Sequence, residues 1–484
     1  MGRIVAAVML LAVPVLAGQQ APTIADSYMD ARRALDRAIA AHGGEEALRR
    51  GRRVRIRMAG EDGWRHQSRR PAPPYDRTPF AGVLHMDLDA GRLVLDLSRR
   101  YPGGIHRQFA FVTAADRSLN VNHRHRAYTV EDYPPAGQQL NNLYFVPQVV
   151  LQLARDSGTR LRSLGQMRLS NGTVVEAIAS STANSSLTIG LEPATHRLRA
   201  VLVVRNDAVD GPIATEVEFL DYRDVNGNLT PGRRIVMTGG DVVEDYAYRE
   251  VVYGEPVADE LIAPPDGYAL REAVETPPVR TLADNVWLIG SGSASLVVAL
   301  GDDVIVIDAA PSAAASVAGH VAKLLAGRKV TYVVPTHHHD DHAPGIRTLA
   351  RDGAAVLTTP DNKALFERMI GSPVQIIEGR RRIFTAGDRS VELHDIGPSP
   401  HAGEMLVAWL PKERILFEAD LIDVTASGVI ERGANNETTM HFLRWLADRG
   451  WTPRVFAGAH GAVIDAAAFT RLAATALSPT AQDR

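Results

Sequence analysis

Residues 336–342 read Thr-His-His-His-Asp-Asp-His, and this stretch decides how the second half of the chain is interpreted. Four of its residues follow the spacing H-x-H-x-D-H: His337, His339, Asp341 and His342. The apolar run 330–334 before it predicts a buried strand, and residues 346–350 after it predict the start of a helix. Imidazoles and carboxylates cost free energy when buried without partners, and they are the usual ligands of a divalent cation. The stretch therefore predicts a metal site on a loop after a core strand.

The composition is that of an ordinary globular protein with room for two or three domains. The chain has 484 residues, of which 45% are hydrophobic and 23% are charged. Its formal net charge of -3 does not favour nucleic acid or an anionic membrane surface as a partner. There is no cysteine, which excludes disulfides, thiolate metal ligands and a thiol nucleophile.

Residues 1–22 have the pattern of a cleavable signal peptide. Arg3 supplies a positive charge, residues 4–16 form an apolar run, and Ala17 lies at a site suited to cleavage. The run is too short to span a bilayer comfortably, and no cysteine follows it to carry a lipid anchor. We therefore expect a periplasmic or secreted protein without stable membrane insertion after cleavage. A retained N-terminal anchor is the alternative.

Residues 23–270 predict a mostly antiparallel β domain with an N-terminal helix over 27–41. Leucines and a methionine alternate with polar residues over 84–88 and 93–97 around a turn at 90–91, which predicts a hairpin. Further strands are expected at 108–113, 127–130, 174–179, 186–191, 198–205, 215–222 and 234–238, with a helix at 144–153. The last two strands are expected to be joined through Asn226-Gly227. Residues 71–79 are rich in proline and predict a surface loop.

Two phrases of this half resemble exported lipoprotein-carrier-type domains: residues 40–44, Ala-Ala-His-Gly-Gly, and residues 219–222 with the turn that follows them. The resemblance implies a curved half-barrel sheet that holds an apolar ligand. His123 and His125 also form an H-x-H pattern, but nothing near them in the sequence supplies a third ligand. We interpret that pair, and Arg69-Arg70, as solvated surface.

A proline-rich stretch separates this domain from the rest of the chain, and we place a linker at 271–279 and a second domain at 280–484. Hairpins come first in the second domain and strand–helix alternation follows, which predicts an α+β or α/β fold of two packed sheets with helices outside. Three polar residues follow predicted strands: His401, Asp420 and His460. Each alone is typical of a surface loop or a turn. If the strand ends meet at one edge, seven side chains converge there.

This pattern resembles the metallo-β-lactamase fold superfamily over residues 280–484, with five motifs in order. Asp308 matches the first motif and the H-x-H-x-D-H stretch the second, and His401, Asp420 and His460 match the remaining three. The resemblance implies an αββα sandwich that binds two Zn²⁺ ions, with iron or manganese as alternatives. It assigns His337, His339 and His401 to one metal, Asp341, His342 and His460 to the other, and Asp420 to both. His338 and Asp340 are expected to point elsewhere.

Two cations about 3.5–4 Å apart can share a bridging water and turn it into hydroxide near neutral pH. We therefore expect a hydrolase of small molecules that attacks an ester, lactone, thioester or amide bond, with Asp341 as the catalytic residue that orients the nucleophile and accepts its proton. Two-zinc β-lactamases carry a cysteine or serine where this chain has Asp420. The alternatives left open are a β-lactamase, a mononuclear iron sulfur dioxygenase, and a lipid-carrier module with an inert sandwich.

Overall fold

The computed structural model describes residues 23–104, 106–114, 117–131, 144–158, 160–181, 186–271, 278–290, 292–310, 314–422 and 436–477. The predicted signal peptide and most of the predicted linker lie outside these residues. Within the described ranges, no helix combines the length and the apolar character needed to cross a bilayer.

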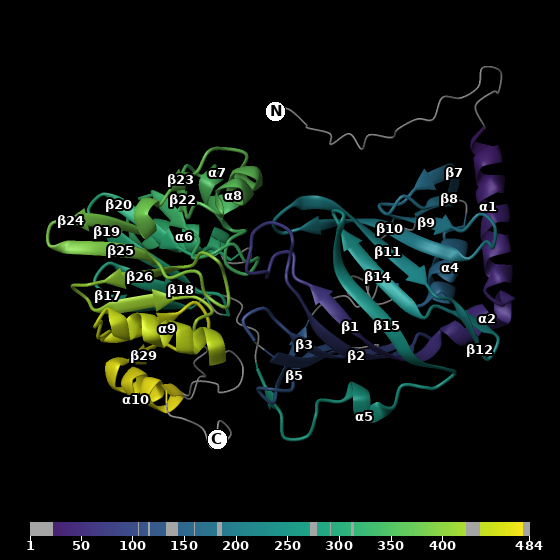
Figure 1. Ribbon diagram of the computed structural model, residues 1–484, viewed down its shortest axis with the longest axis horizontal. Coiled ribbons are helices and arrows are strands. Elements are labelled where there is room, and N and C mark those ends of the chain that lie inside the picture. The colour runs from purple at the N-terminus through teal and green to yellow at the C-terminus, as the bar shows by residue number, and fades with distance from the viewer. Residues whose placement is uncertain are drawn as a thin grey trace.

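The N-terminal part is one long, curved sheet of 14 strands (Figure 1). Its order is β16-β6-β5-β4-β3-β2-β1-β15-β14-β11-β10-β9-β8-β7, and among the strands that the structure describes here only β16 and β6 pair in parallel. The strands are β1 Arg53–Gly63, β2 Arg77–Asp87, β3 Arg92–Arg100, β4 His106–Thr113, β5 Ser118–Asn122, β6 Ala127–Glu131, β7 Leu161–Arg168, β8 Val174–Ser181, β9 Ser186–Leu191, β10 Leu198–Asp207, β11 Gly211–Leu220, β14 Arg233–Thr238, β15 Asp241–Tyr253 and β16 Ala269–Leu270.

The middle of this sheet, β1 and β15, was not predicted from the sequence. In β1 the buried residues Val54, Ile56 and Met58 alternate with arginines, and each of the three is 1% exposed. This period of two is the signal for a half-buried strand. The stretch was not predicted as a strand because the arginines between the apolar residues make it polar as a whole. The predicted hairpin is confirmed, since Leu84 of β2 lies opposite Leu95 of β3.

Two details of the prediction were wrong. Asn226-Gly227 does not join the two predicted long strands but turns a small separate ribbon, β12 Arg223–Val225 and β13 Asn228–Thr230. The predicted loop 71–79 is shorter than expected, because β2 already begins at Arg77 and pairs with the end of β1. Both errors come from reading turn residues without the partner strand that continues the ladder.

Among the described residues, three helices pack on the N-terminal sheet: α1 Ile24–Ala41, α2 Gly44–Gly51 and α4 Pro147–Asp156. One core cluster joins Leu35 of α1 and Leu151 of α4 to Ile189 and Val217 of the sheet. A second cluster joins Val149 of α4 to strands β1, β2, β3 and β15. Helix α4 therefore contacts both halves of the sheet. A short helix, α5 Asp259–Ile262, lies near β3 and β4.

The C-terminal part contains two sheets. The first has the order β17 Val279–Ala283, β18 Val286–Ile289, β19 Ser295–Leu300, β20 Asp303–Ile307, β21 Tyr332–Val334, β22 Ala355–Thr358 and β23 Gln375–Ile376. The second has the order β24 Arg381–Ala386, β25 Arg389–Asp395, β26 Leu406–Leu410, β27 Ile415–Glu418, β28 Val455–Gly458 and β29 Ile464–Asp465. The helices are α6 Ala314–Leu324, α7 Ile346–Arg351, α8 Lys363–Ile370, α9 Asn436–Asp448 and α10 Ala466–Leu477, with a 3₁₀ turn η1 at Glu378–Arg380.

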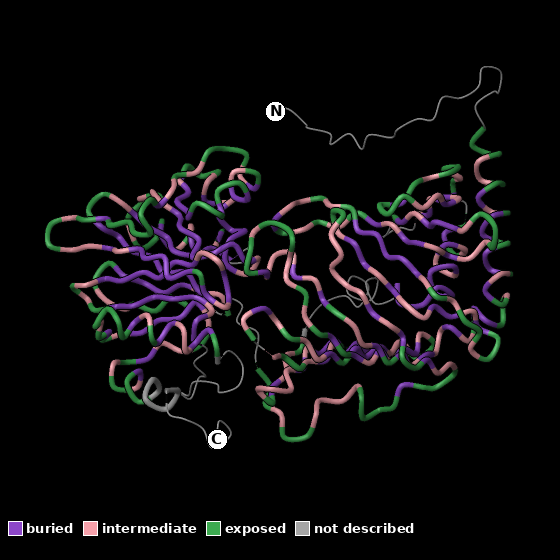
Figure 2. Tube along the Cα trace, viewed as in Figure 1, coloured by how far each residue is buried: buried purple, intermediate pink, exposed green. Residues whose placement is uncertain are grey.

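Alternate residues of one strand build two different cores in this part. Leu296 and Val298 of β19 belong to the cluster that includes Leu406 and Leu416 of the other sheet. Val297, between them, belongs to the cluster with α6, α7 and α8. Because successive side chains of a strand point to opposite faces, β19 is covered on both sides, which explains its unbroken apolar sequence. Helices α9 and α10 contribute Phe442 and Phe469 to the first cluster, and Figure 2 shows how fully the strands are buried.

The two parts touch at the tip of the β10–β11 hairpin. Val209 is 2% exposed and belongs to the core cluster of α6, α7 and α8. Arg347 of α7 donates hydrogen bonds to the carbonyl oxygens of Ala208, at 3.1 Å, and Val209, at 2.7 Å. Arg368 of α8 pairs with Asp210 at 3.4 Å. The buried Val209 side chain and the charge-assisted hydrogen bonds around it therefore hold the N-terminal sheet against the C-terminal sandwich.

We expect Val209→Ala to lower the stability of the chain by about 1–2 kcal/mol, because it removes two buried methyl groups and leaves a cavity at this junction. Val204→Ala in the same hairpin is the matched control, since Val204 is 70% exposed. Denaturant midpoints of the two variants measure the difference. Equal midpoints would show that the hairpin tip does not hold the two parts together.

Candidate metal centre

The seven predicted ligands come together at one edge of the two C-terminal sheets. Strands β20 and β21 run parallel, as do β27 and β28, so the residues after each strand of a pair emerge on the same side. His401 reaches the same place from the connection between β25 and β26. These side chains are far apart in the sequence, between His337 and His460, and the stacking of the two sheets brings them together.

The ligand atoms form two groups that share Asp420. The three-histidine group contains His337, His339, His401 and Asp420, and the Asp341 group contains Asp341, His342, His460 and Asp420. In the first, His337 Nε2 lies 3.3 Å from His401 Nε2 and 3.4 Å from Asp420 Oδ2. In the second, His460 Nε2 lies 3.1 Å from His342 Nε2 and 3.3 Å from Asp341 Oδ2. The arrangement is the one that the resemblance implies.

These spacings suit a tetrahedral cation. Ligand atoms about 2.0–2.1 Å from a Zn²⁺ ion stand roughly 3.3 Å from one another in a tetrahedron. His337 Nε2 and His401 Nε2 lie 3.3 Å apart, and two lone pairs at this distance repel each other unless a proton or a cation lies between them. The donor set of imidazole and carboxylate is also the set that divalent zinc, iron and manganese accept. The residues present therefore fit the metals that the resemblance implies.

Asp308 and Thr336 hold two of the histidines with the correct nitrogen facing the site. Asp308 accepts hydrogen bonds from the Thr336 amide at 2.6 Å, the Thr336 hydroxyl at 3.1 Å and His342 Nδ1 at 2.9 Å. Since the Thr336 hydroxyl donates to Asp308, it accepts from His337 Nδ1 at 3.0 Å. Both rings thus carry their proton on Nδ1 and present Nε2 to the site.

His339 is held in the opposite tautomer. Its Nε2 lies 2.9 Å from the carbonyl oxygen of Ser68, which accepts a hydrogen bond, so the ring proton sits on Nε2. Its Nδ1 is buried and has no hydrogen-bond partner among the described residues. A buried lone pair without a partner costs free energy, and a cation in the three-histidine group satisfies it.

Burial sets the charge of the three-histidine group. It lowers the pKa of His337 to about 4 and also lowers the pKa of His339. Both rings are therefore neutral near pH 7, which is the form that binds metal.

In the Asp341 group, neighbouring charges outweigh burial in setting the pKa values. Burial alone would raise the pKa of Asp341 and Asp420, but the adjacent His342 holds both below their usual range. Burial would lower the pKa of His460, but Asp420 and Asp341 raise it to about 10, and Asp341 and Asp420 likewise raise the pKa of His342. In the metal-free chain, protons on these two histidines neutralise carboxylates that a bound cation would otherwise neutralise.

The backbone at two of the aspartates is strained. Asp308 has φ 62° and Asp420 has φ 57°, in the left-handed region that residues other than glycine seldom adopt. Next to Asp420, Glu418 is fully buried and accepts hydrogen bonds from the amides of Leu421, at 2.8 Å, and Ile422, at 3.4 Å. Burial raises the pKa of Glu418 to about 8, so this carboxyl is neutral near pH 7. These contacts fix the turn that aims Asp420 at the shared position.

The site is open on one side. Among its side chains, Asp341 is 39% exposed and His460 is 24% exposed, whereas His337, His342, His401 and Asp420 are at most 9% exposed. Asp341 and His460 are therefore the ligands of the site that solvent reaches most easily.

Other residues of the histidine-rich stretch face away from both groups. His338 is buried, and burial lowers its pKa to about 3. Asp340 bonds to Gln67, at 2.6 Å from the Gln67 amide nitrogen. His320, His394 and His441, which have no place in the motifs, belong to neither group.

Sequence reasoning missed Gln67 and Ser68, which reach the site from the N-terminal sheet. They lie about 270 positions before the histidines, close to the segment interpreted as a surface loop, and no local pattern marks them. His66, Asp207 and Asp210 also cluster nearby. Asp210 pairs there with Arg65 at 3.0 Å and Arg368 at 3.4 Å, so we interpret that cluster as ion pairs at the junction. His123, of the other H-x-H pattern, contacts the Tyr268 hydroxyl instead, at 3.1 Å.

Comparison with known proteins agrees with the motifs. Residues 288–458 match the family model of the metallo-beta-lactamase superfamily, which confirms the resemblance for this segment. The match includes six of the seven ligands and ends two residues before His460. The likeness of the N-terminal part to lipoprotein-carrier-type domains stays a prediction.

Several solved structures are similar to part of the chain. A metallo-beta-lactamase from Pontibacter korlensis is 21% identical, with 42% of this chain and 100% of that one covered and a TM-score of 0.36. DIM-1 metallo-beta-lactamase is 20% identical, with the same coverage and a TM-score of 0.34. Rubredoxin oxygen:oxidoreductase from Desulfovibrio gigas is 14% identical, with 41% and 61% covered and a TM-score of 0.35.

We expect the metal affinities of the two groups to depend differently on pH. Binding to the Asp341 group must displace protons from His342 and His460, so its affinity rises about tenfold per pH unit for each proton displaced. The rings of His337 and His339 are already neutral, so the affinity of the three-histidine group changes much less between about pH 6 and about pH 8. Competition with a chelator at several pH values measures both. Equal slopes would contradict the assignment of protons to the Asp341 group.

Proposed function

We propose, from the membership of residues 288–458 in the metallo-β-lactamase superfamily, that the chain is an exported dinuclear zinc hydrolase acting on an ester, lactone, thioester or amide bond. The observation that carries this proposal is the sharing of Asp420 between two groups of ligands with tetrahedral spacing. Bound there, two zinc ions would supply a hydroxide nucleophile near neutral pH and polarise the bond under attack.

The chain's own residues would supply binding, orientation and proton transfer. His337, His339 and His401 would hold one ion, His342 and His460 would hold the other with Asp341, and Asp420 would bridge them. Asp341 is the most exposed carboxylate of the site, so it is placed to meet the substrate, orient the nucleophile and accept its proton. The buried Glu418 carboxyl accepts hydrogen bonds from the amides of Leu421 and Ile422 and would hold the turn that carries the bridging Asp420.

We expect the double variant His339→Ala with Asp341→Ala to lose hydrolysis and to hold less than one metal ion per chain, against about two in the parent, because each group loses a ligand. The matched control is His320→Ala with Asp302→Ala, which changes the same residue types outside the site. Metal content by elemental analysis and turnover of a common substrate are measured together. Undiminished turnover in the double variant would refute the proposal.

The substrate class is a separate question with its own experiment. Asp420 stands where two-zinc β-lactamases carry cysteine or serine, which supports a lactone, ester or thioester rather than a β-lactam. A panel of lactones, thioesters, phosphodiesters and the β-lactam nitrocefin, assayed with the purified full chain, would separate these classes. Turnover of nitrocefin alone would make the protein a β-lactamase. One iron and no zinc per chain would favour the sulfur dioxygenase.

Export is part of the proposal and rests on the signal-peptide pattern of residues 1–22. N-terminal sequencing of the protein from fractionated expressing cells would test it. A start near residue 18–22 outside the cytoplasmic fraction supports cleavage and export, an intact Met1 contradicts cleavage, and protein confined to the cytoplasmic fraction contradicts export.

A further inference from the structure

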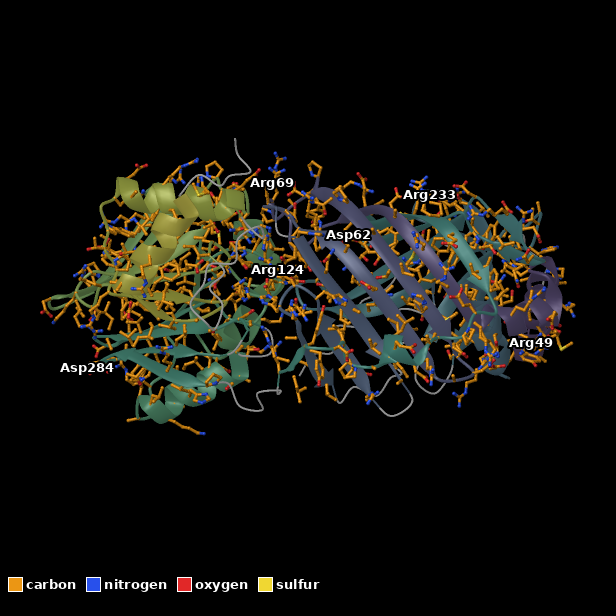
Figure 3. The ribbon with its side chains drawn as sticks, turned by 90° about the horizontal axis from the view of Figure 1, so that it is seen from below. Arg49, Asp62, Arg69, Arg124, Arg233 and Asp284 are labelled. Atoms are coloured by element: carbon orange, nitrogen blue, oxygen red, sulfur yellow. The ribbon has the colours of Figure 1, made fainter. Side chains whose placement is uncertain are left out.

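The connection between β1 and β2, which we call loop 64–76, belongs to the N-terminal sheet but lies against the candidate metal centre. Figure 3 shows Arg69 of this loop at the junction between the sheet and the sandwich. We propose that Gln67 and the Ser68 carbonyl are positioning groups, so that the N-terminal sheet completes the metal site that the sandwich alone leaves unfinished. This inference rests on the proposed function, whose site it concerns.

Four consecutive residues of the loop contact the sandwich. The carbonyl of His66 accepts from the Asp340 amide at 3.2 Å, and the carbonyl of Arg69 accepts from the Gly403 amide at 2.8 Å. Between them, Gln67 contacts Asp341 and Ser68 contacts His339. The flanking backbone bonds thus fix the place of the two residues that touch ligands.

Gln67 orients the carboxylate of Asp341. Its Nε2 lies 2.8 Å from Asp341 Oδ1 and 2.6 Å from Asp340 Oδ1. Both neighbours are carboxylate oxygens that only accept, so the NH₂ end of the amide must face them, with one hydrogen for each. Because Oδ1 of Asp341 is engaged in this way, Oδ2 is the oxygen that faces His460 Nε2, at 3.3 Å, and His342 Nε2, at 3.6 Å. Gln67 therefore selects which oxygen joins the Asp341 group.

Ser68 selects the nitrogen that His339 contributes. The Ser68 carbonyl accepts from His339 Nε2, which leaves Nδ1 as the lone pair in the three-histidine group. Partners of this kind orient metal-ligating side chains, and their loss typically costs roughly 10–100-fold in metal affinity or activity. One loop thus acts on one ligand of each group.

The loop is held in place by hydrogen bonds within itself and by contacts with the N-terminal sheet. Asp76 accepts from the Ser68 hydroxyl at 2.9 Å and from the Arg69 amide at 2.7 Å. Arg65 donates to the Thr238 carbonyl at 2.6 Å and pairs with Asp210 at 3.0 Å and Asp241 at 3.2 Å. The position of Gln67 and Ser68 is therefore set by the fold of the long sheet.

The test uses Gln67→Met in the full chain, because methionine keeps the length and volume of glutamine but has no N–H to donate. Gln166→Met on the exposed face of β7 is the matched control. Metal affinity of each group is measured by chelator competition, and kcat and KM are measured at saturating metal. We expect the Asp341 group of Gln67→Met to bind metal roughly 10–100-fold more weakly, with the three-histidine group within about threefold of the parent.

If Gln67 had only a structural role, Gln67→Met would lower thermal stability and change the metal affinities of the two groups alike. If Gln67 positions Asp341, the variant lowers the metal affinity of the Asp341 group alone and lowers kcat more than it raises KM. Unchanged affinity of the Asp341 group, or equal weakening of both groups, in Gln67→Met would overturn the role of Gln67.

A second variant addresses Ser68. Asp76→Ala removes the acceptor that holds the Ser68–Arg69 segment, so we expect weaker binding in the three-histidine group, with Asp302→Ala on an exposed turn as the control. Unchanged binding there would overturn the role of Ser68. Metal affinity is measured without any substrate. If the variants bind metal more weakly but the parent chain hydrolyses none of the substrates, this inference is supported and the proposed function fails.

Discussion

The structure depends on one buried carboxylate, that of Asp420. It lies 2.7 Å from His342 Nε2, 3.4 Å from His337 Nε2 and 3.5 Å from His401 Nε2, and its other oxygen lies 3.2 Å from His460 Nε2. A buried charge is stable only when it is paired and hydrogen-bonded. The histidines around it supply that pairing, and the strained turn after β27 holds it between them. Asp420 belongs to both groups of ligands, and this shared residue joins them into one site.

The two groups are electrostatically unlike although they share a ligand. Burial keeps His337 and His339 neutral, whereas the carboxylates of the Asp341 group raise the pKa of His342 and His460. The exposed side of the site is the Asp341 side, and the closed side is the three-histidine side. Loop 64–76 touches both groups, and the N-terminal sheet and the sandwich are joined by Val209, Arg347 and the loop itself.

Sequence reasoning was most successful where local chemistry and local periodicity coincide. The stretch 336–342 carries too many imidazoles and carboxylates for a packed core, and the apolar strands of the sandwich are continuous because they are buried on both faces. It was least successful in the N-terminal sheet, where β1 alternates apolar residues with arginine and β15 mixes valine and tyrosine with aspartate, glutamate and arginine. Their long-range pairing with each other is what makes them strands.

The sequence by itself determined which residue types would bind a metal, their grouping after strands, and the fold to which those motifs belong. Only the tertiary structure decided how closely the ligand atoms approach one another, which nitrogen each histidine presents, and that Gln67 and Ser68 reach the site from the other part of the chain. The physical reason is that ligand type is a property of one side chain. Orientation depends instead on hydrogen bonds between segments up to about 270 positions apart, and no local pattern records them.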